Sequence, residues 1–353
     1  MNSGVNPHGG PDADGVPRHD LSTNANACGP YPEALRALQS AEARHYPDPA
    51  YTALTIQLAA WHGVAPERIL PAASGSEFIQ RISTAVALQA GAAGAAVWQP
   101  AHAYGDYARA ARAAGLVPAD DPGRAALLWA CDPSSPLGQP QPGLVELVAG
   151  LRPAQSLVLD LAYEPLRLQG ELALDEDALD RVWRLHSPNK ALGLTGVRAA
   201  YAIAPRRADA ALLGRLRLLA PSWPLGAHGV ALLQSWATLD AHAWLAGCRA
   251  TLRGWKARQV AMLQSAGWRV EPGVANFFVA ACACSARAGG SLGMENLLVS
   301  LRRQGYKLRD CTSFGLPSRL RIAVAAPEVQ DGLLAALAAC GAVSGAQPRE
   351  LCP

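Results

Sequence analysis

The sequence predicts an α/β protein in which helices cover a mostly parallel central sheet, with a smaller α+β domain beside it. Two observations lead to this fold class. Short apolar runs alternate with helical stretches through the middle of the chain, a pattern typical of parallel strands buried on both faces. In addition, 353 residues, of which 50% are hydrophobic and 17% are charged, are enough for one large core and a second, smaller one.

The N-terminal segment has no clear periodic pattern. Residues 1–28 are rich in Gly, Pro, Asn and Asp, which predicts an irregular arm. Helices are expected next, over Pro32–Glu42 and Tyr51–His62. The prolines of the intervening Tyr46-Pro47-Asp48-Pro49 exclude a continuous helix between them.

The middle of the chain holds the predicted parallel strands. We expect strands at Ala95–Gln99, Ala126–Cys131, Ser156–Leu161, Val182–His186 and Ala199–Ile203. We expect helices at Phe78–Leu88, Tyr107–Ala114 and Gly143–Leu151. Ligand sites in such sheets lie in the loops at the carboxyl ends of the strands. The residues that directly follow each apolar run are therefore the candidates for function.

The C-terminal part predicts a separate α+β domain. A long amphipathic stretch over Gly226–Ser265 is expected to connect the two domains. The elements expected beyond it are strands at Asn276–Cys282, Tyr306–Cys311 and Leu320–Ala325 and helices at Met294–Arg303 and Glu328–Cys340. We therefore expect an arm and part of the small domain over 1–43, a large domain over 44–225, and a connecting helix with the rest of the small domain over 226–353.

Composition excludes several classes of function. The net charge is +3 and no run of five Lys or Arg residues occurs, so neither nucleic acid nor a membrane surface is an expected partner. The chain has no apolar run of about 18 residues and a polar N-terminus, which predicts a cytoplasmic protein. Its eight cysteines are scattered, and Cys282 and Cys284 read as a buried strand rather than a metal site. We expect reduced thiols and no metal.

A lysine follows one predicted strand, in Ser187-Pro188-Asn189-Lys190, and Arg198 comes eight residues later. A lysine at the end of a buried strand can lose part of its solvation, which makes its amine available for imine formation. Arg198 offers a bidentate clamp for phosphate. The alternative is an ordinary surface loop, but the chain has only two other lysines, Lys256 and Lys307.

Candidate residues also lie in four other loops. Asp160 closes an apolar run, and a buried carboxylate there requires a cation or a capping role. Gly75 and Ser76 begin a helix and offer N–H and hydroxyl groups to a phosphate, although an N-terminal cap without a ligand looks the same. Tyr104 follows a further run, where its ring can stack on a planar ligand. Ser135 lies in a tight turn that by itself predicts only a turn.

Together these motifs resemble the aspartate-aminotransferase fold family, fold type I of the pyridoxal-phosphate enzymes, which contains the class I and II aminotransferases. S-x-x-K with an arginine eight residues later matches Ser187, Lys190 and Arg198. D-x-A-Y matches Asp160 to Tyr163, and A-Y-G-x-Y matches Ala103 to Tyr107. The resemblance covers nearly the whole chain and implies pyridoxal 5′-phosphate as the cofactor.

The resemblance also implies roles for individual residues. Lys190 resembles the Schiff-base lysine, Asp160 the partner of the pyridine nitrogen and Tyr104 the ring that stacks on the cofactor. The implied cofactor-binding residues are Gly75, Ser76, Tyr104, Ser135, Asp160, Tyr163, Ser187, Lys190, Arg198 and Tyr46. Tyr46 resembles a tyrosine that reaches the cofactor phosphate of a partner subunit, so a homodimer with shared active sites is implied.

Within this family, the start of the chain is similar to that of the threonine-phosphate decarboxylases of cobalamin biosynthesis. They share the His8-Gly9-Gly10 start and a following S-x-N-x-N segment, here Ser22 to Asn26. Leu308 to Cys311 also resembles the segment with their second substrate arginine. The implied substrate-binding residues are His8, Asn24, Ser135, Arg309 and Arg321.

The favoured hypothesis is therefore decarboxylation of L-threonine O-3-phosphate to (R)-1-amino-2-propanol O-2-phosphate. The second hypothesis is an aminotransferase of the histidinol-phosphate type, which would use the same residues. A third is a non-catalytic binding protein that kept the fold. The chain departs from the family at three places: Ser135 replaces an asparagine, Ser187-Pro188-Asn189-Lys190 has unusual middle residues, and Pro221-Ser222-Trp223-Pro224 departs from the usual P-W pattern. These departures suggest an altered substrate preference.

Overall fold

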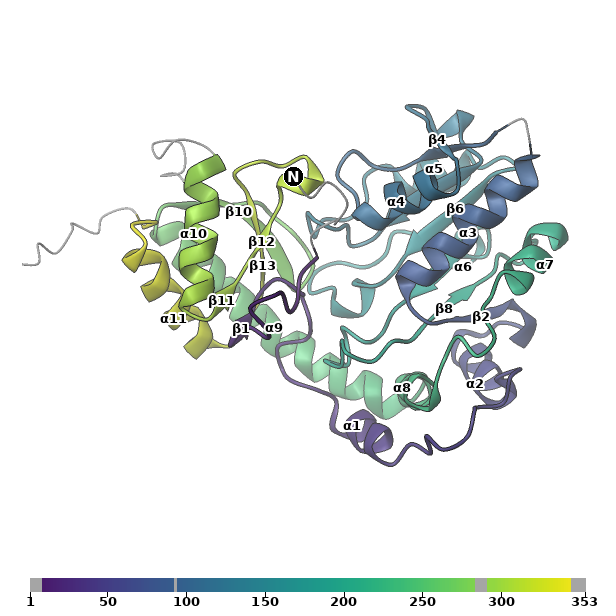
Figure 1. Cartoon of the computed structure of the whole chain (residues 1–353), viewed down its shortest axis with the longest axis horizontal. Coiled ribbons are helices and arrows are strands. Elements are labelled where there is room, and N and C mark those ends of the chain that lie inside the picture. Colours follow the sequence, from purple (N-terminus) through teal and green to yellow (C-terminus); the bar gives the residue numbers. More distant parts are fainter. Residues whose placement is uncertain (1–7, 92–93, 283–290, 344–353) are drawn as a thin grey trace, which may run out of the picture.

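A computed structural model describes residues 8–91, 94–282 and 291–343. It contains a seven-stranded sheet in the order β2-β8-β7-β6-β5-β3-β4, a four-stranded sheet in the order β12-β13-β10-β9, and a two-stranded sheet of β1 and β11 (Figure 1). The strands of the large sheet are β2 (Ile69–Ala72), β3 (Ala96–Trp98), β4 (Val117–Pro118), β5 (Leu127–Cys131), β6 (Ser156–Asp160), β7 (Trp183–His186) and β8 (Ala200–Ile203).

The large sheet is mostly parallel, as predicted. All pairs from β4 through β3, β5 and β6 to β7 are parallel, whereas β8 runs antiparallel to both β7 and β2. Each of the five predicted strands is present, within about a residue of its expected ends. Strand β2 is not apparent from the sequence, because Pro71 interrupts its short apolar run. A proline is tolerated there because β2 lies at the edge of the sheet.

Helices cover both faces of this sheet, which explains its continuous apolar strands. Leu127 and Trp129 of β5 pack in one cluster with residues of α3, α4 and α7, and Leu128 and Ala130 pack on the opposite face with residues of α5. The helices around the large sheet are α1 (Pro32–Gln39), α2 (Thr52–His62), α3 (Gly75–Ala90), α4 (Gly105–Ala113), α5 (Leu144–Ala149), α6 (Glu176–Leu179), α7 (Ala210–Leu218) and α8 (Ala227–Trp236). Short 3-10 turns occur at Pro66–Arg68, Pro122–Arg124, Glu164–Leu166 and Thr312–Phe314.

The long stretch expected to join the two domains forms two helices rather than one. The chain breaks between α8 and α9 (Leu239–Ser265), where the Thr238 hydroxyl caps α9 by accepting a hydrogen bond from the Ala241 N–H. Figure 1 shows α9 extending from α8 to the small sheet. The prediction of a connecting helix is therefore correct for α9 alone.

The small domain is antiparallel. Its sheet consists of β9 (Trp268–Val270), β10 (Phe277–Cys282), β12 (Arg309–Asp310) and β13 (Leu320–Ala323), with α10 (Ser291–Arg303) and α11 (Pro327–Ala339). Sequence analysis predicted one strand over Tyr306–Cys311. The structure has two, since β11 (Tyr306–Lys307) pairs with β1 (His19–Asp20) of the arm and β12 pairs with β13. Part of the arm is thus held in place by the pairing of β1 with β11, which the sequence of the arm alone does not predict.

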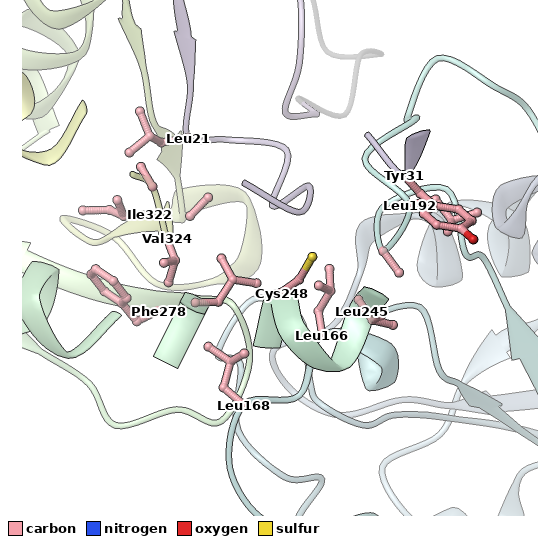
Figure 2. Close-up of a cluster of buried hydrophobic side chains, with 14 of the residues drawn as sticks. Leu21, Tyr31, Leu166, Leu168, Leu192, Leu245, Cys248, Phe278, Ile322 and Val324 are labelled. Atoms are coloured by element: carbon pink, nitrogen blue, oxygen red, sulfur yellow. The ribbon is translucent and has the colours of Figure 1, made fainter. Parts of the chain in front are cut away.

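One core cluster extends across both sheets. Figure 2 shows Leu245 and Cys248 of α9 in the middle of it, with Phe278 and Ile322 of the small sheet on one side and Leu192 on the other. All five are buried. Each fully buried leucine contributes about 1.5–3 kcal/mol, so this shared cluster fixes how the two sheets are placed relative to each other.

Two sequence expectations concern the cysteines and membranes. Free thiols are present at Cys28, Cys131, Cys248, Cys311 and Cys340, whereas Cys282 is disulfide-bonded, which corrects the expectation of reduced thiols at that position. Cys284, Cys352 and residues 1–7 of the arm lie outside the described residues. In the part of the chain that the structure describes, no helix is long and apolar enough to cross a membrane.

Candidate active site

Most of the predicted site residues line a single cavity of about 570 Å³. They come from segments far apart in the sequence: the arm, the ends of several large-sheet strands, and the small sheet. The predicted residues that line it are His8, Gly75, Ser76, Tyr104, Ser135, Asp160, Tyr163, Ser187, Lys190, Arg198, Arg309 and Arg321. Asp160 and Lys190, on which the cofactor prediction depends, therefore lie in the same cavity.

Two predicted residues do not line this cavity. Asn24 is buried in a left-handed turn (φ 61°), and its amide Nδ2 donates a hydrogen bond of 3.3 Å to the Tyr163 hydroxyl, so it supports Tyr163 from outside the cavity. Tyr46 is 76% exposed and stacks on Trp223 at a ring distance of 4.3 Å. Its side chain is thus available to a second subunit rather than to the cavity of its own chain.

Asp160 ends β6 with its carboxylate buried at the floor of the cavity. Oδ2 accepts a hydrogen bond of 2.7 Å from the Tyr107 hydroxyl, and Oδ1 accepts one of 3.0 Å from the Ala162 N–H. Burial raises the pKa of Asp160; Tyr107, the Ala162 N–H and the charge of Lys190 counteract this rise. A buried carboxylate in this state is suited to a cationic ring nitrogen, which would supply the missing counter-charge.

Lys190 lies beyond the end of β7, with its ammonium 5.2 Å from the centre of the Tyr163 ring. Its backbone carbonyl accepts a hydrogen bond of 2.9 Å from the Asn26 N–H, which ties the lysine loop to the arm. The side chain is half-buried, so its amine is accessible from the cavity. Lys190, Tyr163 and Asp160 thus surround one end of the space.

A cradle suited to a phosphate lies at the start of α3. Ser74 caps this helix by accepting a hydrogen bond from the Glu77 N–H, which leaves Gly75 and Ser76 facing the cavity. A Cβ atom at Gly75 would lie 2.9 Å from the Ser187 hydroxyl, so a larger residue there would require that hydroxyl to move. Backbone N–H groups at a helix start and nearby hydroxyls are favourable phosphate ligands, and the exposed Arg198 lines the same cavity.

Arg309 and Arg321 form the opposite, cationic part of the cavity. Both are buried, at 5% and 6% exposure, and neither forms an ion pair with a carboxylate of the described chain. Arg321 donates to Ser135 Oγ (3.1 Å) and to the Ser22 carbonyl (2.8 Å), while its Nε has no partner in that part of the chain. Burial, followed by the charge of Arg321, lowers the pKa of Arg309. Two buried guanidinium groups without a counter-ion define a site for an anion.

Several residues in or beside the cavity carried no predicted role. Tyr107 belonged to the A-Y-G-x-Y motif, but its bond to Asp160 spans 53 positions and has no local signal. Asp106 is buried, and its Oδ2 accepts a hydrogen bond of 2.6 Å from Ser76 Oγ. Asp20 accepts hydrogen bonds from the N–H and the hydroxyl of Ser22, which shapes the arm where it borders the cavity. A D-x-S turn could have indicated this last contact.

The residues present fit pyridoxal 5′-phosphate. A buried carboxylate, an accessible lysine, an aromatic ring and an anion cradle at the start of α3 correspond to its ring nitrogen, aldehyde, ring face and phosphate. Among the described residues, no group of three or more His, Cys, Asp or Glu side chains could hold a metal ion. The fold and this cavity define the class of protein: a cofactor-dependent enzyme of the aspartate-aminotransferase fold.

Comparison with known proteins agrees with this class. Residues 118–337 match the family described as "Aminotransferase class I and II". The chain is 30% identical to the histidinol-phosphate aminotransferase of Rhodospirillum rubrum over 352 residues, covering 92% of this chain and 90% of the relative. It is 28% identical to that of Ruegeria pomeroyi over 326 residues, covering 86% of each.

Solved structures show the same fold. Histidinol-phosphate aminotransferase of Sinorhizobium meliloti in complex with pyridoxal-5′-phosphate aligns with a TM-score of 0.76 at 22% identity, over 95% of both chains. L-threonine-O-3-phosphate decarboxylase of Porphyromonas gingivalis aligns with a TM-score of 0.75 at 19% identity, over 90% of this chain and 98% of that one. A Thermus thermophilus aspartate aminotransferase mutant aligns with a TM-score of 0.72 at 20% identity, over 91% and 95%.

The chain belongs to the aminotransferase class I and II family. The predicted aspartate-aminotransferase-like fold is thereby confirmed, with a mostly parallel seven-stranded sheet and a small antiparallel domain. The predicted cofactor is confirmed as well, because this family uses pyridoxal 5′-phosphate.

Proposed function

We propose that this chain is a pyridoxal-phosphate-dependent aminotransferase of the histidinol-phosphate type, acting on a small phosphorylated amine. The observation that carries the proposal is the pair of buried arginines, Arg309 and Arg321, without a carboxylate partner in the described chain, in the same cavity as Lys190. The histidinol-phosphate aminotransferases that match about nine-tenths of the chain support transamination over decarboxylation. The sequence motifs alone favoured decarboxylation, so these relatives change the preferred hypothesis to transamination.

When bound, pyridoxal 5′-phosphate supplies an aldehyde that combines with an amine and a ring that takes up electrons released at the substrate carbon. The chain's own residues would hold and orient the reactants. Asp160 would keep the ring nitrogen protonated, because a buried carboxylate is stabilised by an adjacent cation. Tyr104 would lie against the ring face, and Gly75 and Ser76 at the start of α3 would bind the phosphate.

Lys190 would act twice. Its ε-amine would hold the cofactor when no substrate is bound. With substrate present, Nζ would remove the proton from the substrate Cα and later return one, because the amine lies within the cavity. The two arginines fix the substrate phosphate by charge-assisted hydrogen bonds, which orients the Cα–H bond for this transfer.

Decarboxylation of L-threonine O-3-phosphate is the second candidate, and one specific observation favours it. His8, Gly9 and Gly10 line the cavity, and this start resembles that of the threonine-phosphate decarboxylases. Gly9 cannot be replaced without a clash, because a Cβ there would overlap the Ser22 carbonyl. An anionic substrate with both phosphate and carboxylate would also satisfy Arg309 and Arg321. The two reactions differ in which Cα bond is broken.

The proposed assembly is a homodimer of cytoplasmic subunits with shared active sites. The exposed Tyr46 supports it, since this side chain stacks on Trp223 outside its own cavity. The Trp223 Nε1–H donates a hydrogen bond of 3.0 Å to the Pro47 carbonyl, which holds the segment in place for a partner.

The reaction is tested with purified holoenzyme and two substrates. With L-histidinol phosphate and 2-oxoglutarate, we expect glutamate to form in amounts equal to the amine consumed. With L-threonine O-3-phosphate, we expect no release of CO2. Release of CO2 without formation of glutamate would replace the proposal by the decarboxylase. A colourless protein that binds no cofactor would instead indicate the non-catalytic alternative.

A further inference from the structure

A second cavity lies at the edge of the seven-stranded sheet opposite the candidate active site. Its volume is about 720 Å³, larger than the 570 Å³ of the active-site cavity. It is lined by the starts of β6 and β7 and by residues 205–209, which follow β8. Because β6 begins at Ser156 in this cavity and ends at Asp160 in the other, the two cavities are separate.

The floor of this second cavity is apolar. Leu157, Trp183 and Leu212 line it at 1%, 2% and 3% exposure, and Val86 of α3 lies beside them at 6%. Their burial means that the floor is part of the packed core rather than a mobile surface. Beside this floor, Leu151, Pro153 and Pro205 also line the cavity, and these apolar side chains are half-buried or exposed, so a ligand can cover them.

The rim of the cavity is charged. Four arginines and three aspartates line it: Arg152, Arg181, Arg206, Arg207, Asp177, Asp180 and Asp209. Two of the carboxylates are already engaged. Asp180 lies 2.7 Å from Arg68 and 2.6 Å from Arg206, and Asp209 caps α7 by accepting the Leu212 N–H at 2.8 Å. The negative charge of the rim is therefore largely compensated before a ligand binds.

The positive charge of the rim is not compensated in the same way. Arg152, Arg181 and Arg207 form no ion pair with any carboxylate in the described part of the chain. Arg181 reaches only the carbonyls of Ala149 and Leu151, each at 3.4 Å. The three guanidinium groups are exposed and come from the loop after α5, the end of α6 and the loop after β8, so their convergence is a tertiary feature.

We propose that this cavity binds a small organic anion, whose apolar body lies against Leu151, Pro153 and Pro205 and whose phosphate or carboxylate group is held by Arg181 and Arg207. A guanidinium group binds either anion in a bidentate manner. The partly exposed apolar side chains add affinity for the body of the ligand, which an inorganic anion lacks. The proposal does not rest on the reaction proposed for the active site.

Calorimetric titration of the holoenzyme tests the proposal. The probes are phenyl phosphate and phenylacetate, which distinguish the two anionic groups, and inorganic phosphate, which lacks the apolar body. We expect wild-type protein to show two binding events per chain with phenyl phosphate, one of them at Arg309 and Arg321. The double variant Arg181→Ala/Arg207→Ala should lose the other event or weaken it at least tenfold, whereas Arg321→Gln should lose only the active-site event.

Control measurements separate binding from folding. The exposed Arg253 on α9 lies outside both cavities, so Arg253→Ala should retain both events. Circular dichroism of the double variant should match wild type, because both side chains are exposed. The proposal is wrong if neither organic probe gives a second event in wild type, or if that event survives in the double variant. It is also wrong if inorganic phosphate binds there as tightly as phenyl phosphate.

Discussion

The Tyr107 hydroxyl donates a hydrogen bond of 2.7 Å to Asp160 Oδ2, joining α4 to the end of β6 beneath the candidate active site. Tyr107 is held in this position by a stack on Trp129, with ring centres 4.4 Å apart and planes 6° from parallel. Both rings are buried. The carboxylate proposed to face the cofactor nitrogen is thus oriented by a tyrosine that the cavity itself does not include.

Replacing Tyr107 by phenylalanine should weaken cofactor binding. The variant removes one of the two hydrogen bonds to Asp160 and leaves a buried acceptor unpaired, which costs about 1–3 kcal/mol. We expect the dissociation constant for pyridoxal 5′-phosphate to rise about tenfold or more, since 1.4 kcal/mol corresponds to a factor of ten. Tyr51→Phe is the matched control: it removes a buried hydroxyl that bonds Leu225, so it should lower stability alone. Equal cofactor affinities in the two variants would contradict the role of Tyr107.

Replacing Lys190 should abolish catalysis without unfolding the protein. Lys190→Arg keeps the positive charge near Asp160 but cannot form an imine with the cofactor. We expect the visible absorbance of lysine-bound cofactor to disappear, and reduction by borohydride should leave no cofactor attached to the protein. A labelled lysine found at Lys256 or Lys307 in the wild type would refute the assignment.

Replacing Arg321 by glutamine should raise KM for the phosphorylated substrate more than it lowers kcat. The variant removes one of the two buried guanidinium groups that are proposed to bind the substrate anion. Hydrogen bonds to charged groups contribute about 1.5–3 kcal/mol, so we expect KM to rise about tenfold to a hundredfold. Arg321→Lys should restore part of the affinity, because it restores the charge but not the bidentate geometry. An unchanged KM would show that the substrate anion binds elsewhere.

His62 should make the protein acid-sensitive. Burial, aided by the charges of Arg184 and His242, lowers the pKa of His62 from 6.5 to about 4, and its ring lies 2.8 Å from the Tyr201 hydroxyl. As the pH falls, His62 is protonated in the unfolded chain before it is protonated in the folded one. The free energy of unfolding is therefore unaffected by His62 above pH 6.5 and decreases as the pH falls towards 4. This change amounts to about 3 kcal/mol.

Urea denaturation at several pH values between 7 and 4 measures this effect. His62→Gln keeps a polar side chain but cannot titrate, so its free energy of unfolding should depend less on pH than that of wild type. His228→Gln, at an exposed position on α8, should retain the dependence of wild type. If the two variants respond to pH alike, His62 is not the responsible group.

Much of the site could be predicted because its signals are local. Asp160 and Lys190 each follow an apolar run, and the geometry of a parallel sheet brings such positions to one edge. Gly75 was predictable from another local signal, as it comes just before the helical run Phe78–Leu88. The placement of Asn24 was not, because its left-handed backbone directs the amide to Tyr163, 139 positions away.

The rest of the fold depends on pairings that a single segment does not encode. The residues of β11 and β12 read as one continuous strand in the sequence, and only their partners, β1 and β13, divide it between two sheets. Likewise, the break between α8 and α9 is marked by one capping threonine within a continuous helical pattern. The domain boundaries at residues 43 and 225 stay predictions.

The hydrogen bond from Arg321 to the Ser22 carbonyl has a consequence for biosynthesis. It joins residues separated by 299 positions, so the anion pocket cannot form while the ribosome still holds the last strand of the sheet. A nascent chain that has completed β2 through β8 can bury its own large sheet, but it lacks the arginines that would select a substrate. Ligand selectivity therefore arises only once β13 has been synthesised and can meet the arm.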